Sequence, residues 1–260
     1  AMIECLVGSE MCIRDSDMGE LEFYLKQNIT TTPGNYTISQ SAHIQKMLEG
    51  MNMSKSTPTS LPYCKGLMTT ILNEGRGPSS NVKNTPVDST VYRSALGALN
   101  YPAVMTRPDI ACLVSILQRY QQQPKRNHMK AVRHLQRYLQ GTADLGLKYT
   151  GGPVQLEAWN DSSWADDVDN AESQYGWRID LCGAPVAWKS GLQRCTAQSS
   201  TEAVYVALAD IICELLFLTS LLAEMGHLQQ PVQIHEDNKG VLYVTKGEGK
   251  HSKRRHININ

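Results

Sequence analysis

The sequence contains no C-x-x-C pair, no excess of either charge and no long apolar run. Its seven cysteines are odd in number and scattered, which argues against a disulfide framework or a structural zinc site and suits a reducing compartment. Because the formal net charge is zero, a nucleic-acid partner would have to be recognised by a local basic patch. No stretch approaches the ~18 consecutive apolar residues of a membrane span, so no membrane partner is expected.

The chain does have enough apolar material for a core, since 41% of its 260 residues are hydrophobic and 19% are charged. These proportions predict one large folded domain or two small ones rather than a disordered chain. Residues 1–16, AMIECLVGSEMCIRDS, fit poorly with the rest of the chain and are too short and interrupted for a signal peptide. We interpret them as a non-native leader, similar to translated adapter or vector sequence, and expect the fold to begin at Asp17.

The first half of the chain has the pattern of helices separated by a polar connection. Residues 17–53 end in an amphipathic helix, and residues 54–90, rich in Ser, Thr, Pro, Gly and Asn, are typical of a surface linker. Residues 91–150 predict three helices, the second with Thr106 as its cap and Pro108 in its first turn. The side chains expected to face a core are Ile44, Met47, Leu48, Ile110, Leu113, Leu117, Tyr120, Met129, Val132, Leu135 and Leu139.

The last of these helices carries a basic stripe on the side away from the expected core. Four basic residues follow one another at i, i+4, i+7 and i+11: Arg126, Lys130, Arg133 and Arg137. A stripe of this kind can follow a phosphate backbone. A run of charges alone is more often a solvated helix face. The spacing therefore leaves both interpretations open, contact with a phosphate backbone and simple exposure to solvent.

From Leu156 the apolar pattern changes to the two-residue alternation of strands. A strand, a hairpin with Gly183-Ala184 near its turn, a long helix stopping at Gly226, a short strand and a second helix over NKGVLYVTKG come next. One face of the long helix is expected to carry Tyr205, Leu208, Ile212, Leu215 and Leu222. This order predicts an α/β (α+β) domain over residues 151–260, with helices packed on a mixed sheet.

Three acidic residues lie at the ends of these elements. Asp161 closes the first strand, Glu202 lies in the first turn of the long helix, and Asp237 closes the short strand. Acids at the ends of neighbouring strands can converge, and a divalent cation then offsets their repulsion. Oxygen ligands suit Mg²⁺ or Mn²⁺, and two such ions ~4 Å apart can promote phosphodiester hydrolysis. Each acid also has a structural interpretation, as a turn residue, a capping-box partner of Ser199 or a helix cap.

Nine segments after residue 16 carry a family resemblance. They are DMGELEFYL, TISQSAHIQKMLEGMNM, YRSALGALNY, TRPDIA, HLQRYLQGTADLGLKY, WNDSSWADD, YGWRIDLCGAPVAWKS, SSTEAVYVALADIICELLFL and EDNKG. Together and in this order they resemble the C-terminal part of a copia-type LTR retrotransposon Pol polyprotein, where the end of the reverse transcriptase is followed by the ribonuclease H domain. No single segment is decisive, but the ordered set across residues 17–260 is specific.

The resemblance implies a ribonuclease H-like mixed five-stranded sheet with flanking helices, preceded by a mainly helical reverse transcriptase thumb and connection remnant. It also implies metal-dependent hydrolysis of the RNA strand of RNA–DNA hybrids. The family's first three acids match Asp161, Glu202 and Asp237, which would hold a two-ion Mg²⁺ (or Mn²⁺) site. The family's HID aligns with His256-Ile257-Asn258, so Asn258 stands at the fourth metal-binding position, where an amide is a weaker ligand for a hard cation.

The resemblance leaves alternative functions open. The chain is either a ribonuclease H-type endonuclease fragment that contacts the hybrid through the basic stripe, or a non-catalytic relic that folds and at most binds nucleic acid. The relic is favoured by Asn258, by the absence of a final helix and by the unusual residues 1–16. A third alternative, a cellular protein-binding module, has no support beyond these losses. The polymerase aspartates would precede Asp17 and are absent, so polymerisation is not expected. The implied partners are nucleic acid and the remainder of the Pol polyprotein, in the cytoplasm within a virus-like particle.

Overall fold

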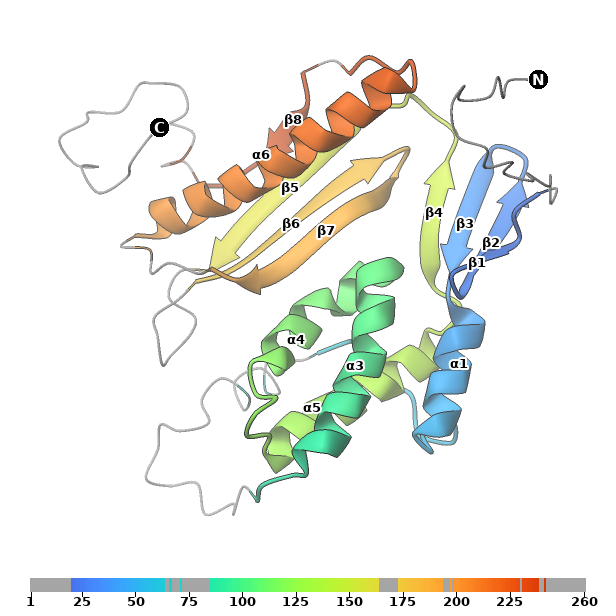
Figure 1. The fold of residues 1–260 in the computed structure, drawn as a ribbon, viewed down its shortest axis with the longest axis vertical. Helices are drawn as coiled ribbons and strands as arrows, with labels where there is room; N and C mark the ends of the chain where they lie inside the picture. Colours follow the sequence, from blue (N-terminus) through green and yellow to red (C-terminus); the bar gives the residue numbers. More distant parts are fainter. Residues whose placement is uncertain are drawn as a thin grey trace, which may run out of the picture.

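A computed structural model describes residues 20–63, 66, 71, 85–163, 173–193, 197, 199–229, 231–238 and 241. Within this part of the chain, an antiparallel four-stranded sheet, a group of helices and a second four-stranded sheet adjoin one another in space (Figure 1). The first sheet has the strand order β1-β2-β3-β4. Its strands are β1 Phe23–Tyr24, β2 Gln27–Thr32, β3 Asn35–Ser39 and β4 Gly146–Thr150.

Four helices build the first hydrophobic core. They are α1 Ser41–Gly50, α3 Ser89–Met105, α4 Pro108–Gln118 and α5 Arg126–Gly141. The side chains predicted to face a core do so: Met129 and Tyr120 are partly buried against it and the others are buried. Pro108 occupies the first turn of α4 as predicted, where its missing N–H has no cost. The prediction of Thr106 as the helix cap is wrong, because α3 runs on to Met105 and Thr106 ends that helix while Arg107 precedes α4.

Two features of this half were not expected. Strand β4 pairs with β3 and completes the first sheet, with Gly146 opposite Ser39, although the region was predicted to be mainly helical. A side chain at position 146 would place its Cβ only 2.4 Å from the backbone oxygen of Ile38, so glycine allows the two strands to approach. The side chain of Ile71, inside the predicted linker 54–90, is fully buried in the core, so this connection is not entirely a surface segment.

The second sheet has the strand order β7-β6-β5-β8. Its strands are β5 Leu156–Ser163, β6 Gln174–Leu181, β7 Ala184–Leu192 and β8 Gln233–His235. β8 runs parallel to β5 and the other pairs are antiparallel, which confirms the predicted mixed sheet. The described residues supply four of the five expected strands, and most of the predicted NKGVLYVTKG helix lies outside them.

The β6–β7 hairpin turns one residue earlier than predicted, at Cys182-Gly183. Both residues have positive φ angles, 52° and 83°, as a type I′ hairpin turn requires at its two central positions. The turn and the pairing of Leu181 with Ala184 hold β6 and β7 in register.

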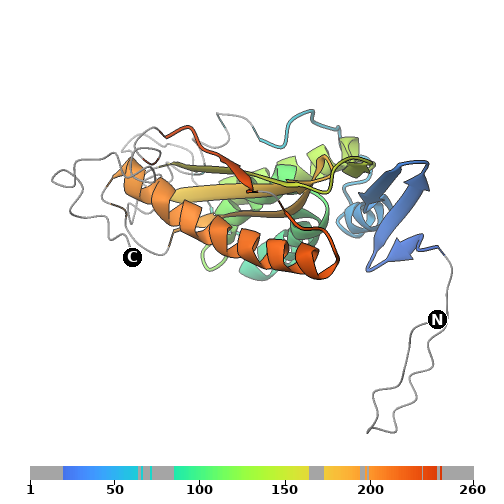
Figure 2. The ribbon, with the colours of Figure 1, turned by 90° about the horizontal axis from the view of Figure 1, so that it is seen from above.

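Helix α6, Ser200–Glu224, runs along one face of the second sheet (Figure 2). Its buried side chains are Ala203, Val204, Ala207, Ile211, Leu215 and Leu222. The predicted inward face was therefore partly wrong, since Ile212 is 39% exposed, whereas Leu215 and Leu222 are buried as expected. The helix ends as predicted before Gly226, whose φ of 86° suits the left-handed conformation that often terminates a helix.

In the part of the chain that the structure describes, α6 is long and apolar enough to cross a membrane by length and composition, a property that core helices share.

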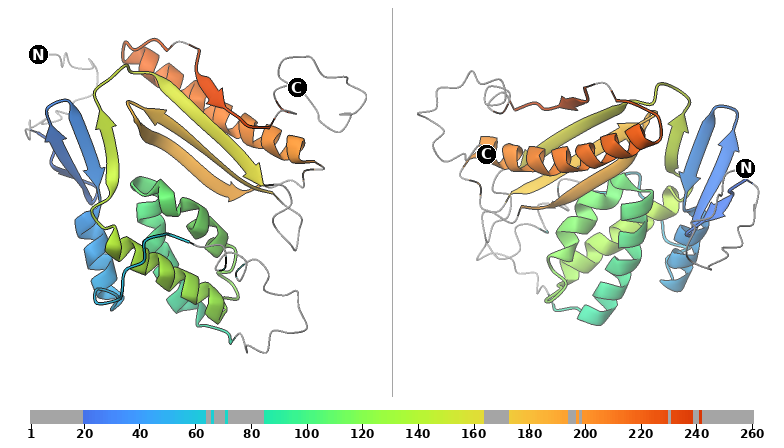
Figure 3. Two further views of the ribbon diagram at one scale, coloured as in Figure 1. Left: turned by 180° about the vertical axis from the view of Figure 1, so that it is seen from behind. Right: turned by 45° about the horizontal axis from the view of Figure 1, so that its top comes forward.

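The packing of α6 on the second sheet includes polar contacts as well. Asp210 in the middle of α6 accepts hydrogen bonds from Trp177 Nε1 at 2.6 Å and from Lys189 Nζ at 2.9 Å. These contacts fix α6 to β6 and β7. Figure 3 shows α6 with the second sheet as one group and α3, α4 and α5 as another.

Candidate functional site

A cleft of about 1090 Å³ lies between the start of α4 and the second sheet. Alternation along β5 decides which side chains face it. Ala158 and Asn160 are buried on the side of α6, and the Asn160 amide lies 3.5 Å from the backbone oxygen of Val204 in that helix. Trp159 and Asp161 therefore point to the opposite face, where they line the cleft.

The parallel pairing of β5 and β8 brings two of the predicted site residues to one place. Trp159 is in register with His235, and Asp161 and Asp237 each lie two residues further along their segments. Both aspartates are exposed and line the cleft. Asp161 also lies opposite Gly176 of β6, which has no side chain to fill the adjacent space.

Two residues that the sequence did not single out support this pair. Asn160 is buried, and its Nδ2 donates to Glu236 Oε2 at 2.8 Å, which ties β5 to the segment after β8. Burial raises the pKa of the Glu236 carboxyl, and the negative charges of Asp237 and Asp161 raise it further. Hydrogen bonds from the Asn238 backbone N–H and from Asn160 oppose the rise without cancelling it. The inward position of Asn160 in an otherwise apolar alternation was the available sequence signal.

Glu202 occupies a different position from the two aspartates. Its backbone N–H donates to Ser199 Oγ at 3.2 Å, so the capping interpretation of Ser199 is confirmed. The Glu202 side chain is half-buried in the first turn of α6 and is not part of the cleft lining. Across the described residues, no three His, Cys, Asp or Glu side chains gather as a metal site. Asn258 lies outside the described residues.

The basic stripe lies on α5, away from the acidic cleft. Arg126, Lys130 and Arg133 are exposed there. Arg137 is partly committed to structure, since its Nε donates to the backbone oxygen of Thr57 at 2.5 Å. Only three members of the stripe are thus fully on the surface, and none of them lines the cleft.

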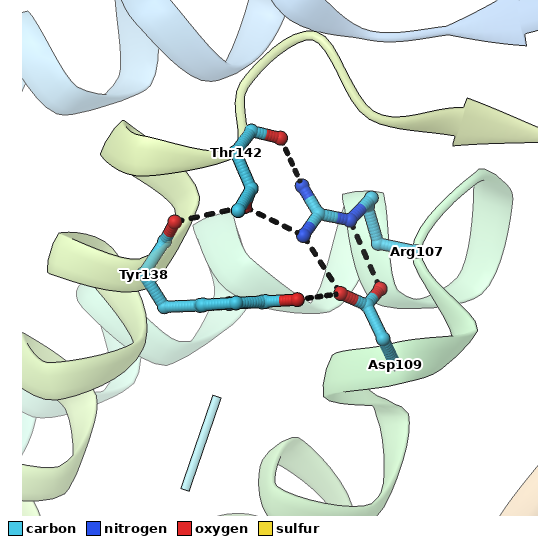
Figure 4. Close-up of polar contacts among 4 residues, drawn as sticks. All are labelled: Arg107, Asp109, Tyr138 and Thr142. Carbon is cyan, nitrogen blue, oxygen red and sulfur yellow. Dashed lines mark hydrogen bonds and ion pairs between the residues drawn. The ribbon is translucent and has the colours of Figure 1, made fainter. Parts of the chain in front are cut away.

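A partly buried polar cluster holds the α4 wall of the cleft in place (Figure 4). The guanidinium of Arg107, which is 1% exposed, donates to both carboxylate oxygens of Asp109, at 2.9 and 2.7 Å. It also donates to the backbone oxygen and the hydroxyl of Thr142, both at 2.8 Å, beyond the end of α5. Tyr138 Oη completes the cluster by donating to Asp109 at 2.7 Å. The cluster therefore joins the start of α4 to the end of α5.

The ionisation of this cluster is set by its contacts. Burial alone would raise the pKa of the Asp109 carboxyl, but the hydrogen bonds and positive charge of Arg107, with the Tyr138 hydroxyl, outweigh burial and lower it. Burial and the neighbouring Asp109 raise the pKa of Tyr138. The ionised carboxylate and the protonated phenol are therefore the forms that the fold stabilises.

Comparison with known proteins gives homologues along nearly the whole chain. The chain is 31% identical to the retrovirus-related Pol polyprotein from transposon TNT 1-94 of Nicotiana tabacum, over 94% of this chain and 18% of that protein. It is 33% identical to the corresponding polyprotein from transposon RE1 of Arabidopsis thaliana, over 94% of this chain and 16% of that protein. It thus spans less than a fifth of the length of these polyproteins.

A shorter relative matches part of the chain more closely. The secreted RxLR effector protein 161 of Plasmopara viticola is 40% identical over 139 residues, which is 53% of this chain and 94% of that protein. No protein-family model and no solved structure matches the chain. The agreement over 94% of its length with two plant polyproteins shows that this chain is homologous to a segment of the retrovirus-related Pol polyproteins of transposons.

Proposed function

We propose that the chain is the ribonuclease H portion of a retrotransposon Pol polyprotein, with the end of the reverse transcriptase before it, and that it hydrolyses the RNA strand of RNA–DNA hybrids. The observation that carries this proposal is the β5–β8 pairing, which brings Asp161 and Asp237 into one cleft. The homology to Pol polyproteins supplies the nucleic-acid context. The remainder of the polyprotein is the proposed partner.

The chemistry of the cleft suits a hard divalent cation. Both aspartates offer carboxylate oxygens to the same space, and Mg²⁺ is commonly held by one or two carboxylates together with water and substrate phosphates. Asp161 and Asp237 would hold Mg²⁺ or Mn²⁺ here, and Glu202 in the adjacent turn of α6 is the proposed third ligand. Such ions, bound as a pair, activate water and stabilise the leaving oxygen of a phosphodiester.

The residues around the aspartates have positioning roles in this proposal. Asn160 fixes the distance between β5 and the segment after β8 through its bond to Glu236. The Arg107 cluster fixes the opposite wall, because Asp109 both lines the cleft and bonds to Arg107. A duplex bound at the aspartates would extend beyond the cleft, and the exposed part of the basic stripe is the proposed contact for its backbone.

The test is Mg²⁺-dependent cleavage of a labelled RNA–DNA hybrid by the wild type, Asp161→Asn and Asp237→Asn. We expect each substitution to reduce the rate by roughly 10²-fold or more, the scale of losing one electrostatic group of a transition state. Asp144→Asn, an exposed aspartate outside the cleft, is the matched control and should cleave like the wild type. Wild-type rates in Asp161→Asn would contradict the proposed site.

The fourth metal-binding position of the family, where Asn258 stands, is tested with a separate variant. If the wild type is inactive with both Mg²⁺ and Mn²⁺ while Asn258→Asp cleaves the hybrid, the asparagine is the lesion in an otherwise intact site. Inactivity of both proteins would instead favour the non-catalytic relic.

A further inference from the structure

The strand that leads to Asp237 is the shortest strand of the second sheet. β8 is 3 residues long, whereas β5 and β6 each have 8 residues and β7 has 9. In the part of the chain that the structure describes, β8 also lies at an edge of the sheet, so it pairs with β5 alone. The place of Asp237 beside Asp161 therefore depends on side-chain contacts that hold this short strand.

The core face of β8 supplies little of this hold. Alternation leaves Ile234 as the one β8 side chain on the face that meets α6, opposite Ala158 of β5. Ile234 is only partly buried against the apolar core under α6. Its two strand neighbours, Gln233 and His235, are exposed on the other face. The contacts of the cleft face are therefore important for β8.

On the cleft face, β8 is attached to β5 through His235. The rings of His235 and Trp159 are stacked, with their centroids 5.1 Å apart and their planes 15° from parallel. His235 Nε2 also lies 2.7 Å from Glu157 Oε1. Trp159 and Glu157 both belong to β5, so these two contacts fix the position of β8 along β5.

The second face of the Trp159 ring is covered as well. The guanidinium carbon of Arg178, in β6, lies 4.5 Å from the centroid of the ring. Arg178 Nε lies 2.9 Å from Asp180 Oδ1 in the same strand, which holds the guanidinium in place. Stacked aromatic and guanidinium groups at these separations stabilise one another. The indole is thus clamped between β6 and β8 and cannot turn away from His235 without losing Arg178.

Successive residues of β5 hold successive residues of the β8 segment from opposite faces. Trp159 stacks on His235 on the cleft face, and Asn160 donates to Glu236 Oε2 at 2.8 Å on the other side. The next residue along each segment is one of the two aspartates of the cleft. The backbone is thus fixed from both faces immediately before the side chains that would bind a cation.

We propose that Trp159 is a positioning residue of the candidate metal site. Its stack on His235 holds β8 in register and keeps Asp237 beside Asp161. The inference rests on the proposed function, in which the two aspartates bind a divalent cation. Trp159 touches neither cation nor substrate in this role, and it acts through the β8 backbone, in the way that outer groups orient the ligands of other metal sites.

The first measurement is Mn²⁺ binding to the full chain by electron paramagnetic resonance, which needs neither substrate nor turnover. Trp159→Ala should weaken Mn²⁺ affinity by about 10-fold to 100-fold, the range for losing a group that orients a metal ligand. Trp159→Phe should retain most of the affinity, because a ring still stacks on His235. Trp188→Ala is the matched control, since it removes the same side chain from β7, at the other end of the described strand order. It should bind Mn²⁺ like the wild type.

The second measurement is amide hydrogen exchange of residues 232–236, which reports on β8 itself. Exchange there should be faster in Trp159→Ala than in the wild type, Trp159→Phe or Trp188→Ala. His235→Ala should have the same effect as Trp159→Ala. The double variant should lose no more Mn²⁺ affinity than either single variant, because both substitutions remove one shared contact.

Unchanged exchange of β8 in Trp159→Ala would overturn the positioning role. An equal loss of Mn²⁺ affinity in Trp188→Ala would also overturn it, because the effect would then be general destabilisation. Asp237→Asn separates this inference from the proposed function. If Asp237→Asn binds Mn²⁺ like the wild type, the metal site of the proposed function is refuted, while faster β8 exchange in Trp159→Ala still supports the hold on β8.

Discussion

At the scale of single residues, the Arg107 cluster shows how one buried cation can fix two helix ends. Arg107 lies between α3 and α4, and four of its hydrogen bonds reach Asp109 and Thr142. A guanidinium supplies this forked set of donors in one plane, which an ammonium group does not.

Replacing Arg107 with lysine should therefore destabilise the protein although the charge is kept. We expect a loss of about 1–3 kcal/mol in the free energy of unfolding, since the part-buried acceptors of Asp109 and Thr142 lose their hydrogen-bond donors. Urea denaturation followed by circular dichroism measures it. Arg93→Lys is the control, because Arg93 is exposed and its hydrogen bonds among the described residues are to Ser89 of its own helix. An equal loss there would show that the cluster is not the cause.

The same cluster predicts a pH dependence of stability. The pKa of Asp109 is lowered in the folded protein from its usual 3.8, so folding favours the carboxylate. This contribution is complete above pH 3.8 and is lost as the pH falls through the lower, folded-state pKa. The stability difference between wild type and Asp109→Asn should accordingly shrink over that acidic range. Denaturant titrations from pH 6 downwards would detect it, and a constant difference would contradict the assignment.

At the scale of elements, the sequence predicted local structure well and distant pairing poorly. The helical faces of α1, α4 and α5 are set by apolar spacing within each segment, and they were predicted correctly. Strand β4 was missed because its partner β3 lies more than 100 residues earlier, where no local pattern signals the pairing. The inward face of α6 was partly misjudged because this helix is apolar around most of its circumference, which leaves its periodicity weak.

The close approach of β3 and β4 makes Gly146 a specific weak point. Gly146→Ala should cost about 1–3 kcal/mol of stability, because the new methyl group meets the Ile38 carbonyl and the strands must separate. Gly97→Ala in α3 is the control, since nothing lies within 4 Å of the added Cβ and alanine is the better helix former by roughly 0.5–1 kcal/mol. Thermal unfolding should shift in opposite directions for the two variants.

The basic stripe on α5 is testable as a unit. Replacing Arg126, Lys130 and Arg133 with glutamine should lower the salt dependence of hybrid binding, with the log–log slope changing by roughly 1 for each phosphate contact removed. Arg137 is left unchanged because it bonds to Thr57 and its loss would disturb the fold. Anisotropy titrations at several salt concentrations give the slope.

A second triple variant controls for net charge. Lys46, Lys55 and Arg93 are exposed basic residues outside the stripe. If replacing these three changes the slope as much as replacing the stripe does, the stripe has no special role in binding.

At the scale of the whole molecule, the cleft depends on contacts between the two halves of the chain. Trp188 of β7 bonds to Ala103 of α3, and Arg119 beyond α4 bonds to Gln174 of β6. Helix α4 contributes one wall of the cleft and the second sheet the other.

The arrangement of the whole molecule also shows which residues of the candidate site could be predicted from the sequence. Asp161 and Asp237 were predicted from strand-end positions and family resemblance, and the structure brings both to the cleft. The position of Glu236 beside the aspartates could not be derived in this way, because it depends on the β5–β8 register and on the hydrogen bond from Asn160. Glu202, equally prominent in the sequence, is placed outside the cleft lining.

The parallel pairing of β5 with β8 has a consequence for biosynthesis. The apolar core around α1, α3, α4 and α5 is composed of residues up to Ala143, so it is complete on a ribosome that has not yet translated the second sheet. Asp161 emerges soon afterwards, but its neighbour Asp237 appears only when α6 has been made and β8 has returned to β5. A nascent chain therefore completes its apolar scaffold well before its acidic pair exists.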